Sequence, residues 1–304
     1  MQKPKIVLSR CFSEPVRYNG ERVNNNFVNR LKEFVDFIDF CPEVDTGLGV
    51  PRKRVSIIEI DGLKKLIQTE TGKDLTDIIT EYSQKVINSL KEIDGFILKA
   101  KSPSCGVGSA RLYRNNSFIG KTSGFFAEKI KNHFYYLPVE DENRLRDESI
   151  REHFLIRIFA FAELRALLNN PTPKNLVDFH TRYKYLLMTY SQRYLKEIGQ
   201  IVADNSIPFE EKIIRYRQKF YESFLRKPSP KRHINTLMHI TGYISKNLNP
   251  EEKKHLHSLI ERYIKGRLPL NVITELLKSF VYRFGNEYLL YQKYLHPYPE
   301  ELNV

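Results

Sequence analysis

Three cysteines are the residues of this sequence with the clearest potential for chemistry. Cys11, Cys41 and Cys105 are the only cysteines among 304 residues, and each follows a short apolar run that predicts a β-strand. Three thiolates can hold a metal centre and leave one coordination position open, which is where metal-centred chemistry takes place. Three unrelated buried thiols are the alternative, since free cysteine is among the most buried residue types. Spacing alone leaves both interpretations open.

The first half of the chain alternates strand and helix patterns. Apolar runs predict strands, and apolar residues at helical spacing predict helices between them. The β-α-β order predicts an α/β open sheet (Rossmann-like), in which ligands bind at the carboxyl ends of the strands. All three cysteines follow strands, so we expect them to converge. The expected strands are residues 6–8, 35–40, 95–99 and 56–60, the last of these at a sheet edge, and the expected helices lie within residues 27–34 and 74–92.

The second half of the chain is helical in pattern throughout. A charged stretch at residues 140–152 separates the halves, and we place the two domains at residues 1–143 and 144–304. Proline and asparagine clusters punctuate the helical runs. The fold class is therefore an α/β N-terminal domain followed by an all-α C-terminal domain. Its expected helices are residues 154–168, 176–203, 208–225, 234–248, 250–266 and 270–294.

Composition and charge narrow the class of protein. The chain is 41% hydrophobic and 28% charged, as in ordinary globular proteins. No apolar run approaches the roughly 20 residues that cross a bilayer, and no signal peptide is evident, so we expect a cytoplasmic location. Residues 151–304 hold 25 Lys+Arg against 15 Asp+Glu, a net charge of +10 out of +13 for the chain. This imbalance predicts a polyanionic partner, most often nucleic acid, with a merely soluble basic surface as the alternative.

Three ordered blocks surround the cysteines. They are Cys11 with residues 16–20, Cys41, Pro42 and Glu43 with Gly47, Leu48, Pro51 and Arg52, and residues 101–106 ending in Cys105 and Gly106. These blocks resemble those of a known family, the thiouracil desulfidases. The resemblance covers residues 5–140 and includes a downstream block at residues 118–125. Residues 12–14 depart from the usual apolar pair and glycine, and Asn19 stands where Asp is commoner.

A second resemblance covers the helical half. Its matching blocks are residues 176–180, 185–191, 235–243 and 289–299, and they are similar to the YbgA-type helical domain. Proteins that fuse the two domains resemble tRNA 4-thiouridine desulfidases, in which the helical domain holds the tRNA. This resemblance implies that tRNA containing 4-thiouridine is the partner and substrate.

The first resemblance also implies the cofactor. Cys11, Cys41 and Cys105 would hold a [4Fe-4S] cluster with one open iron, which can polarise a thiocarbonyl bond as a Lewis acid. Water then replaces the sulfur, which leaves as hydrosulfide, with no net redox change. Two rivals stay open. One is the same chemistry on free thiouracil or thio-nucleosides, and the other is a non-catalytic RNA-binding protein with structural zinc, although no short C-x₂₋₄-C spacing supports it.

Residues beside the cysteines are candidates for moving protons. Glu43 lies two residues after a ligand cysteine, so on an extended segment both side chains point the same way. Its carboxylate can deprotonate water and return the proton, or it can be a structural ion-pair partner. Ser102 is predicted to orient water or hold this base, Ser104 could do so instead, and a plain turn role is open for both. Lys101 and Arg52 balance negative charge or are solvated surface residues.

Candidate RNA contacts lie in the helical half. His180, Lys184 and Arg193 fall on one predicted helix, and His180 and Lys184 share a face at i, i+4. Cations interleaved with aromatic rings suit phosphate contacts and base stacking. The alternative is that the rings belong to the core, which is the commoner position for a tyrosine at helical spacing. The rings are Tyr183, Tyr190 and Tyr194.

Overall fold

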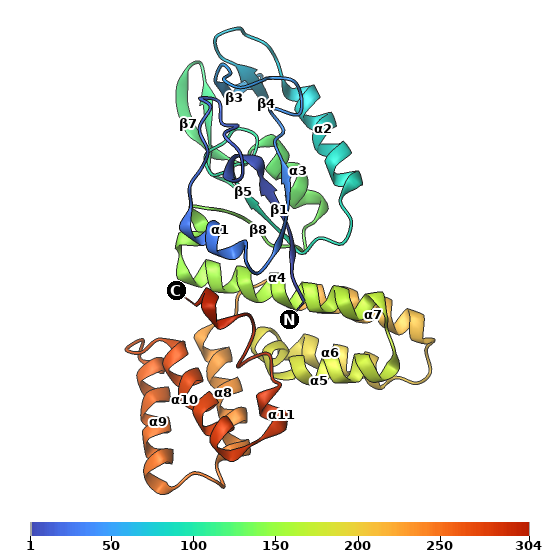
Figure 1. The fold of residues 1–304 in the computed structure, drawn as a ribbon, viewed down its shortest axis with the longest axis vertical. Helices are drawn as coiled ribbons and strands as arrows, with labels where there is room; N and C mark the ends of the chain where they lie inside the picture. The colour runs from blue at the N-terminus through green and yellow to red at the C-terminus, as the bar shows by residue number, and fades with distance from the viewer. Residues whose placement is uncertain (1, 304) are drawn as a thin grey trace. The chain divides into compact units, whose positions relative to one another are not determined.

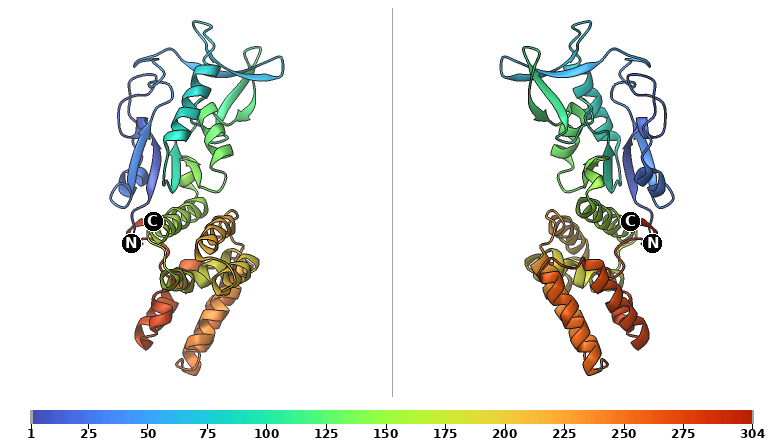
Figure 2. Two further views of the ribbon diagram at one scale, coloured as in Figure 1. Left: turned by 90° about the vertical axis from the view of Figure 1, so that its right-hand side faces the viewer. Right: turned by 90° about the vertical axis from the view of Figure 1, so that its left-hand side faces the viewer.

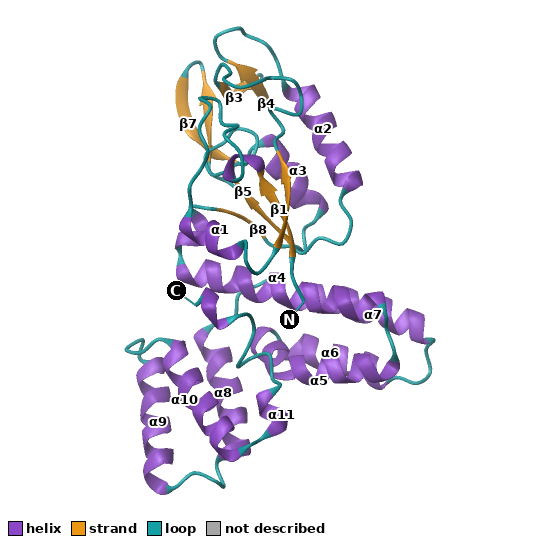
Figure 3. Ribbon diagram, in the orientation of Figure 1, coloured by secondary structure: helices purple, strands orange, loops and turns teal. Residues whose placement is uncertain are grey.

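The structure is a computed structural model that describes residues 2–303. Within that range the strands precede residue 142, and the elements after it are helical (Figures 1 and 3). The chain divides into two compact units, of which one is Ala166–Glu300 and the other is the remainder of the described chain. The predicted fold class, α/β followed by all-α, is confirmed.

A parallel sheet forms the centre of the first unit, in the strand order β2-β1-β5-β8. β1 and β5 are buried along their length, as expected for parallel strands covered on both faces. In the register, Ser9 lies opposite Phe40 and Leu98 opposite Asp141, so the carboxyl ends of the strands are level. The strands are β1 (Lys5–Ser9), β2 (Asp36–Phe40), β5 (Gly95–Leu98) and β8 (Val139–Asp141).

A second sheet follows the order β4-β3-β6-β7 and was not expected from the sequence. Two hairpins build it, with Asp61-Gly62 and Asn115-Asn116 at positive φ in the turns, as type I′ turns require. β3 pairs with β6 in parallel and with β4 in antiparallel. The prediction that residues 56–60 form an edge strand is therefore wrong, because β3 lies between two partners. The strands are β3 (Val55–Ile60), β4 (Leu63–Gln68), β6 (Ala110–Arg114) and β7 (Ser117–Thr122).

Helices pack on both sheets of the first unit. α2 packs against the second sheet through a buried cluster that includes Ile57, Leu66 and Ile79. α4 lies against the parallel sheet, where a Cβ on Gly95 would stand 3.0 Å from Ile158. The helices are α1 (Asn26–Leu31), α2 (Thr76–Ser89), α3 (Phe125–His133) and α4 (Glu148–Asn169), the last of which extends four residues past the first unit.

Two helices of the second unit are shorter than the sequence pattern predicts. The expected helix at residues 176–203 is broken at Ser191, whose backbone is extended and whose hydroxyl caps the next helix by accepting from the Tyr194 N–H. The expected helix at residues 270–294 ends at Gly285, which adopts the left-handed conformation. α8, α9 and α10 pack against one another. They are drawn in orange to red in the two views of Figure 2. The helices are α5 (Pro173–Tyr190), α6 (Gln192–Ala203), α7 (Phe209–Ser223), α8 (Pro230–Ile244), α9 (Pro250–Ile264), α10 (Leu270–Phe284) and α11 (Glu287–Leu290).

None of the helices in residues 2–303 combines the length and the apolar character that a membrane span needs.

Candidate active site

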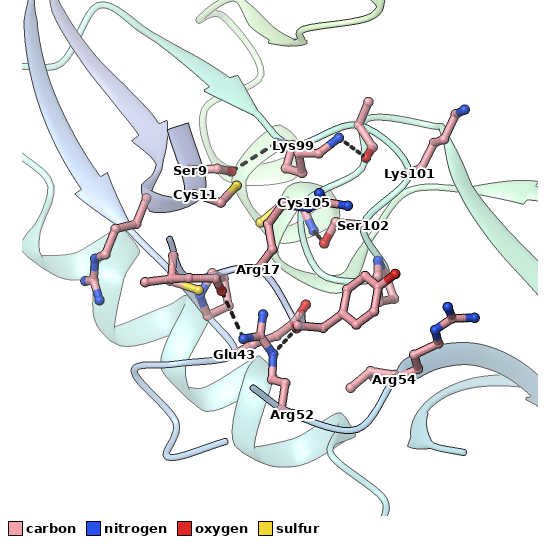
Figure 4. Close-up of a pocket in the computed structure, with 18 of the residues that line it drawn as sticks. Ser9, Cys11, Arg17, Glu43, Arg52, Arg54, Lys99, Lys101, Ser102 and Cys105 are labelled. Atoms are coloured by element: carbon pink, nitrogen blue, oxygen red, sulfur yellow. Dashed lines mark hydrogen bonds and ion pairs between the residues drawn. The ribbon is translucent and has the colours of Figure 1, made fainter. Parts of the chain in front are cut away.

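A cavity of about 470 Å³ lies at the carboxyl edge of the parallel sheet, and all three cysteines line it. Cys11 follows β1, Cys41 follows β2, and Cys105 sits in the loop after β5 (Figure 4). β1 pairs with both β2 and β5, so neighbouring strands deliver the three thiols to one place. The predicted convergence of the cysteines is confirmed, and their role as ligands stays a prediction.

The second sheet supplies the opposite wall of this cavity. Val55 and Ser56 from β3 and Arg111 and Tyr113 from β6 line it. The two sheets therefore enclose a space that neither forms alone. The thiols lie on the side of the parallel sheet, and the second sheet adds an aromatic ring and a cation.

The thiols of the cavity are buried and resist ionisation. Burial raises the pKa of Cys11 to about 12, and it also raises the pKa values of Cys41 and Cys105. Hydrogen bonds oppose this rise at two of the sulfurs. The Ser9 hydroxyl donates to Cys105, and two backbone N–H groups of the following turn donate to Cys41. A bound metal group would offset the remaining cost of ionising the buried thiols, since its positive charge favours the thiolate.

The loop that carries Cys105 is fixed by its own serine and by a close glycine. The Ser102 Oγ accepts hydrogen bonds from the backbone N–H groups of Ser104 at 3.2 Å and Cys105 at 3.1 Å. A Cβ on Gly124 would stand 2.5 Å from the backbone of Ser104, so only glycine lets α3 begin this close to the loop. The block at residues 118–125 therefore matters to the site because it supports the loop.

Glu43 is the one acidic side chain among the described residues that line the cavity, and it is buried. Its Oε2 accepts from Arg52 Nε at 2.7 Å, and its Oε1 accepts from Ser104 Oγ at 2.9 Å. Arg52 is itself held by the carbonyl of Val16 at 2.9 Å. Both carboxylate oxygens are thus fixed in place, and Arg52 is no solvated surface residue.

The two serines of the loop have different partners. Ser104 holds Glu43, whereas Ser102 lines the cavity and accepts from the turn backbone. The geometry supports Ser104 as the residue that orients the carboxylate. Ser102 has the turn role that was one of its expected roles, and its catalytic role stays a prediction.

Asp45 is a site residue that sequence reasoning missed. It accepts both Arg10 guanidinium N–H groups, at 2.6 and 3.0 Å, the Cys41 backbone N–H at 3.2 Å and the Tyr82 hydroxyl. Burial raises the pKa of Asp45, but the hydrogen bonds from Tyr82 and Arg10 outweigh burial and lower it. Since Arg10 precedes Cys11, this carboxylate ties two thiol loops together. The feature of the sequence that could have indicated Asp45 is its position four residues after Cys41, in the same turn.

Two further carboxylates that the sequence did not reveal, those of Glu142 and Asp141, support the loop after β5. Glu142 accepts the Ala100 backbone N–H at 2.6 Å and also pairs with Lys99. Asp141 accepts from the Ser109 hydroxyl at 2.8 Å. Both residues stand at the end of β8, so the fourth parallel strand also contributes to the site.

Lysines and arginines dominate the charged lining of the cavity. Arg10, Arg17, Arg52 and Lys99 are each paired with a carboxylate. Three further cations at the mouth are exposed and take part in no ion pair among the described residues: Arg54, Lys101 and Arg111. The mouth therefore carries unbalanced positive charge.

The predicted RNA contacts of the helical unit do not share one helix. His180 and Lys184 lie on α5 and Arg193 on α6, so the prediction of a single helix is wrong. Burial and the charge of Lys184 lower the pKa of His180 to about 4. Arg193 pairs with Glu197 at 3.4 Å. Their contact with RNA stays a prediction.

Comparisons with known proteins agree with both resemblances. Residues 6–142 match the family of 2-thiouracil desulfurases, and residues 184–299 match DUF1722, a family of proteins of unknown function. The uncharacterized protein YbgA of Escherichia coli (strain K12) is 30% identical over 153 residues, which are 49% of this chain and 90% of YbgA. The uncharacterized protein YbbK of Bacillus subtilis (strain 168) is 32% identical over 154 residues, which are 47% of this chain and 98% of YbbK.

A solved structure of a [4Fe-4S]-dependent thiouracil desulfidase, TudS, is 28% identical, with a TM-score of 0.39, and the match covers 49% of this chain and 98% of that chain. The family match of residues 6–142 confirms the resemblance of the cysteine blocks, and the matches to DUF1722 and YbgA confirm that of the helical half. The chain belongs to the 2-thiouracil desulfurase family through residues 6–142 and to the DUF1722 family through residues 184–299, so it combines the two domains in one polypeptide.

Proposed function

We propose that this protein is an iron–sulfur-dependent desulfidase that converts 4-thiouridine in tRNA to uridine and hydrosulfide. The observation that carries the proposal is one cavity lined by three thiols, which follow adjacent parallel strands, and by a fixed carboxylate. Membership of the 2-thiouracil desulfurase family supports the desulfidase reaction. In that reaction the oxygen of water replaces the thiocarbonyl sulfur, and no electrons are exchanged.

The donor set of the cavity fits a [4Fe-4S] cluster held by Cys11, Cys41 and Cys105. Soft thiolates suit iron–sulfur clusters, and hydrogen-bond donors already point at two of the sulfurs. Among the described residues, no three His, Cys, Asp or Glu side chains are grouped closely enough to hold a single metal ion. When bound, such a cluster supplies a Lewis-acid iron that favours the soft sulfur of a thiocarbonyl group.

Glu43 is the proton carrier in this proposal. A carboxylate that accepts from Arg52 and Ser104 keeps one orientation, and each oxygen has a second lone pair free to accept a proton from water. It can then return the proton to the ring nitrogen or to the departing sulfur. The buried position of Glu43 limits competition from bulk water.

Phosphate groups on the substrate explain the cations at the cavity mouth. Arg54, Lys101 and Arg111 are exposed without ion-pair partners among the described residues, and Arg54 lies over the Tyr18 ring at 5.3 Å. Unpaired cations beside an aromatic ring suit a nucleotide within a polyanionic chain. The net charge of +10 on residues 151–304 points to the same partner.

Free thiouracil or a thio-nucleoside is the second candidate substrate. The description of the matched family names 2-thiouracil, which favours this alternative. A free base carries no phosphate, however, and would leave the three mouth cations without a counter-charge. Relative turnover of the two substrate classes decides between the candidates.

The test is anaerobic incubation of the iron–sulfur-reconstituted protein with thiolated tRNA, free 4-thiouridine and 4-thiouracil in parallel. Mass spectrometry of digested RNA measures the conversion of 4-thiouridine to uridine. We expect conversion of the tRNA, and we expect Cys41→Ala to abolish both conversion and iron binding. An intact cluster that converts only the free base would favour the second candidate, and conversion by Cys41→Ala would refute the cluster assignment.

A further inference from the structure

The segment around α8 has an unusual charge composition. Residues 223–250 contain five Lys and Arg residues and no Asp or Glu. Arg226 and Lys231 lie on the loop before α8 and in its first turn, and Lys246 lies just after its end. All three are exposed and take part in no ion pair among the described residues. A positive field along one helix therefore stays unneutralised by the protein itself.

The exposed residues of α8 share one face. At 3.6 residues per turn they fall within an arc of roughly 140°, while the buried Leu237, Ile240 and Ile244 occupy the opposite side. This face carries two large side chains that are half exposed, Met238 at 46% and Tyr243 at 51%. The exposed set is Lys231, Arg232, Met238, His239, Gly242, Tyr243 and, by continuing the helical period, Lys246.

Gly242 lies in the middle of this face, and packing within the protein does not explain it. Glycine is the least favoured residue inside a helix apart from proline. Apart from its chain neighbours and its own helix backbone, no heavy atom of the described residues lies within 4 Å of where its Cβ would stand. Its φ is not in the left-handed region either. A partner that approaches the helix backbone closely would require a glycine here.

The Tyr243 ring is held by neighbouring rings and is exposed enough to stack on a base. Its ring lies 5.4 Å from the Tyr288 ring and 6.3 Å from the buried Tyr185 ring. These neighbours fix the ring in place from one side and leave about half of it exposed. Nucleic-acid bases stack on aromatic rings held in this way, and Lys246, one turn further on, can reach a phosphate.

We infer that the exposed face of α8, together with Arg226 in the loop before it, is the surface through which the helical unit binds tRNA. Arg226, Lys231 and Lys246 would contact phosphates, Tyr243 would lie under a base, and Gly242 would be at the closest approach. The inference rests on the proposed tRNA substrate and assigns the contact to a different unit from the one that holds the thiol cavity. Charge complementarity favours RNA as the occupant, since the face offers cations and a ring and no acidic group along the segment.

Charge reversal tests the phosphate contacts. Arg226→Glu combined with Lys231→Glu in the full-length, iron–sulfur-loaded protein should weaken binding of a tRNA transcript roughly tenfold or more. The dependence of log affinity on log salt should also become shallower by about one for each phosphate that the protein no longer neutralises. The matched control is Lys253→Glu with Lys254→Glu on α9, which makes the same charge change next to Glu251 and Glu252 and should bind nearly as the wild type.

Gly242→Ala tests the close approach independently of charge. The added methyl group meets no atom of the described residues beyond its own helix, so thermal stability should be unchanged or higher. Affinity for tRNA should still fall several-fold. Tyr243→Phe should keep that affinity and Tyr243→Ala should lose it, because stacking needs the ring and not the hydroxyl.

Three outcomes would overturn the inference, and each has a distinct meaning. If wild-type protein binds and desulfurates tRNA and the α8 variants do so equally, only the α8 assignment fails. If wild-type protein converts free 4-thiouridine but binds no tRNA at low salt, the proposed substrate fails with it. If polyglutamate displaces the tRNA as well as unlabelled tRNA does, the face binds acidic polymers in general and the RNA assignment fails.

Discussion

Charged side chains are arranged differently around the thiol cavity and on α8. In the cavity Glu43 is held by Arg52 and Ser104, and Arg10 and Lys99 are paired with carboxylates behind the thiol loops. On α8 and in the loop before it, Lys231 and Arg226 are exposed and take part in no ion pair among the described residues. The difference suits two tasks. Chemistry needs groups fixed to within a fraction of an ångström, whereas phosphate binding needs cations whose counter-charge comes from the partner.

The carboxylates beside the thiols are fully hydrogen-bonded, whereas buried polar atoms without a partner among the described residues occur in both units. Every oxygen of Glu43 and Asp45 has a hydrogen-bond donor. In the helical unit, the buried His180 Nδ1, Tyr216 hydroxyl and Thr241 hydroxyl have no hydrogen-bond partner among the described residues. In the first unit Asp39 Oδ1 is likewise buried without a partner among the described residues, so the contrast holds for the carboxylates of the thiol site and not for the two units as wholes.

The sharpest test of the cavity's fixed charges is Glu43→Gln. It keeps the shape of the side chain and removes the proton acceptor, so kcat should fall by about 10²–10⁴ while the cluster is retained. Anaerobic kinetics on thiolated tRNA, with iron and sulfide content measured on the same sample, check this. A Glu43→Gln or Glu43→Ala protein that turns over like the wild type would remove Glu43 from the mechanism.

A smaller loss of kcat is expected when the Glu43 carboxylate is kept but is no longer held in one orientation. Ser104→Ala removes the donor to Glu43 Oε1 and should lower kcat by about 10–100-fold with little change in KM. Ser102→Ala is the neighbouring control, because its hydroxyl holds the turn and should affect retention of the cluster more than kcat. Equal effects of the two variants on kcat at full cluster content would contradict this division.

The unpaired cations at the cavity mouth should behave like those of α8. Arg54→Gln combined with Arg111→Gln should raise KM for thiolated tRNA by about tenfold at physiological salt. Conversion of free 4-thiouracil should hardly change, since that base has no phosphate. The ratio of the two effects is the measurement, and an equal loss on both substrates would show that these residues act on the reaction itself.

The smallest effect is expected in the acid stability of the helical unit. Burial, with the charge of Lys184 at His180, lowers the pKa of His180 to about 4, and burial lowers that of His233 to about 4, from 6.5. The unfolded chain therefore binds protons at these sites first, so stability present above pH 6.5 should be lost as pH falls towards 4. The loss is at most about 1.4 kcal/mol per group for each pH unit.

Thermal unfolding of His180→Gln with His233→Gln between about pH 7 and about pH 4 tests this. The slope of the melting temperature against pH should be shallower in the double variant than in the wild type. The exposed His239→Gln serves as the control and should keep the wild-type slope. An unchanged slope in the double variant would place the acid sensitivity elsewhere.

Local patterns in the sequence were enough to predict several features. The apolar runs of β1 and β5 and the cysteines at the strand ends predict a sheet edge with three thiols. The start of the helix expected at residues 250–266 is also confirmed, and there Asn249 forms a capping box with Glu252 at the start of α9. These features depend on neighbours in the chain, and the structure confirms them.

Other features depend on contacts between distant segments. The turns at Asp61-Gly62 and Asn115-Asn116 are local, but the parallel pairing of β3 with β6 joins segments far apart in the chain, and no local pattern specifies it. A break such as Ser191 inside a helical period is equally hard to predict, because serine also occurs within helices.

The sequence by itself determined which residue types could do chemistry and that the basic charge lies in the helical half. Only the tertiary structure decided that Ser104 rather than Ser102 meets Glu43, that Asp45 joins the Cys41 turn to Arg10, and that Arg54, Lys101 and Arg111 lack ion-pair partners among the described residues. The physical reason is that a hydrogen bond depends on the direction of the donor and on a donor–acceptor distance of a few ångströms. Those are set where loops from several strands meet, and spacing along the chain does not encode them.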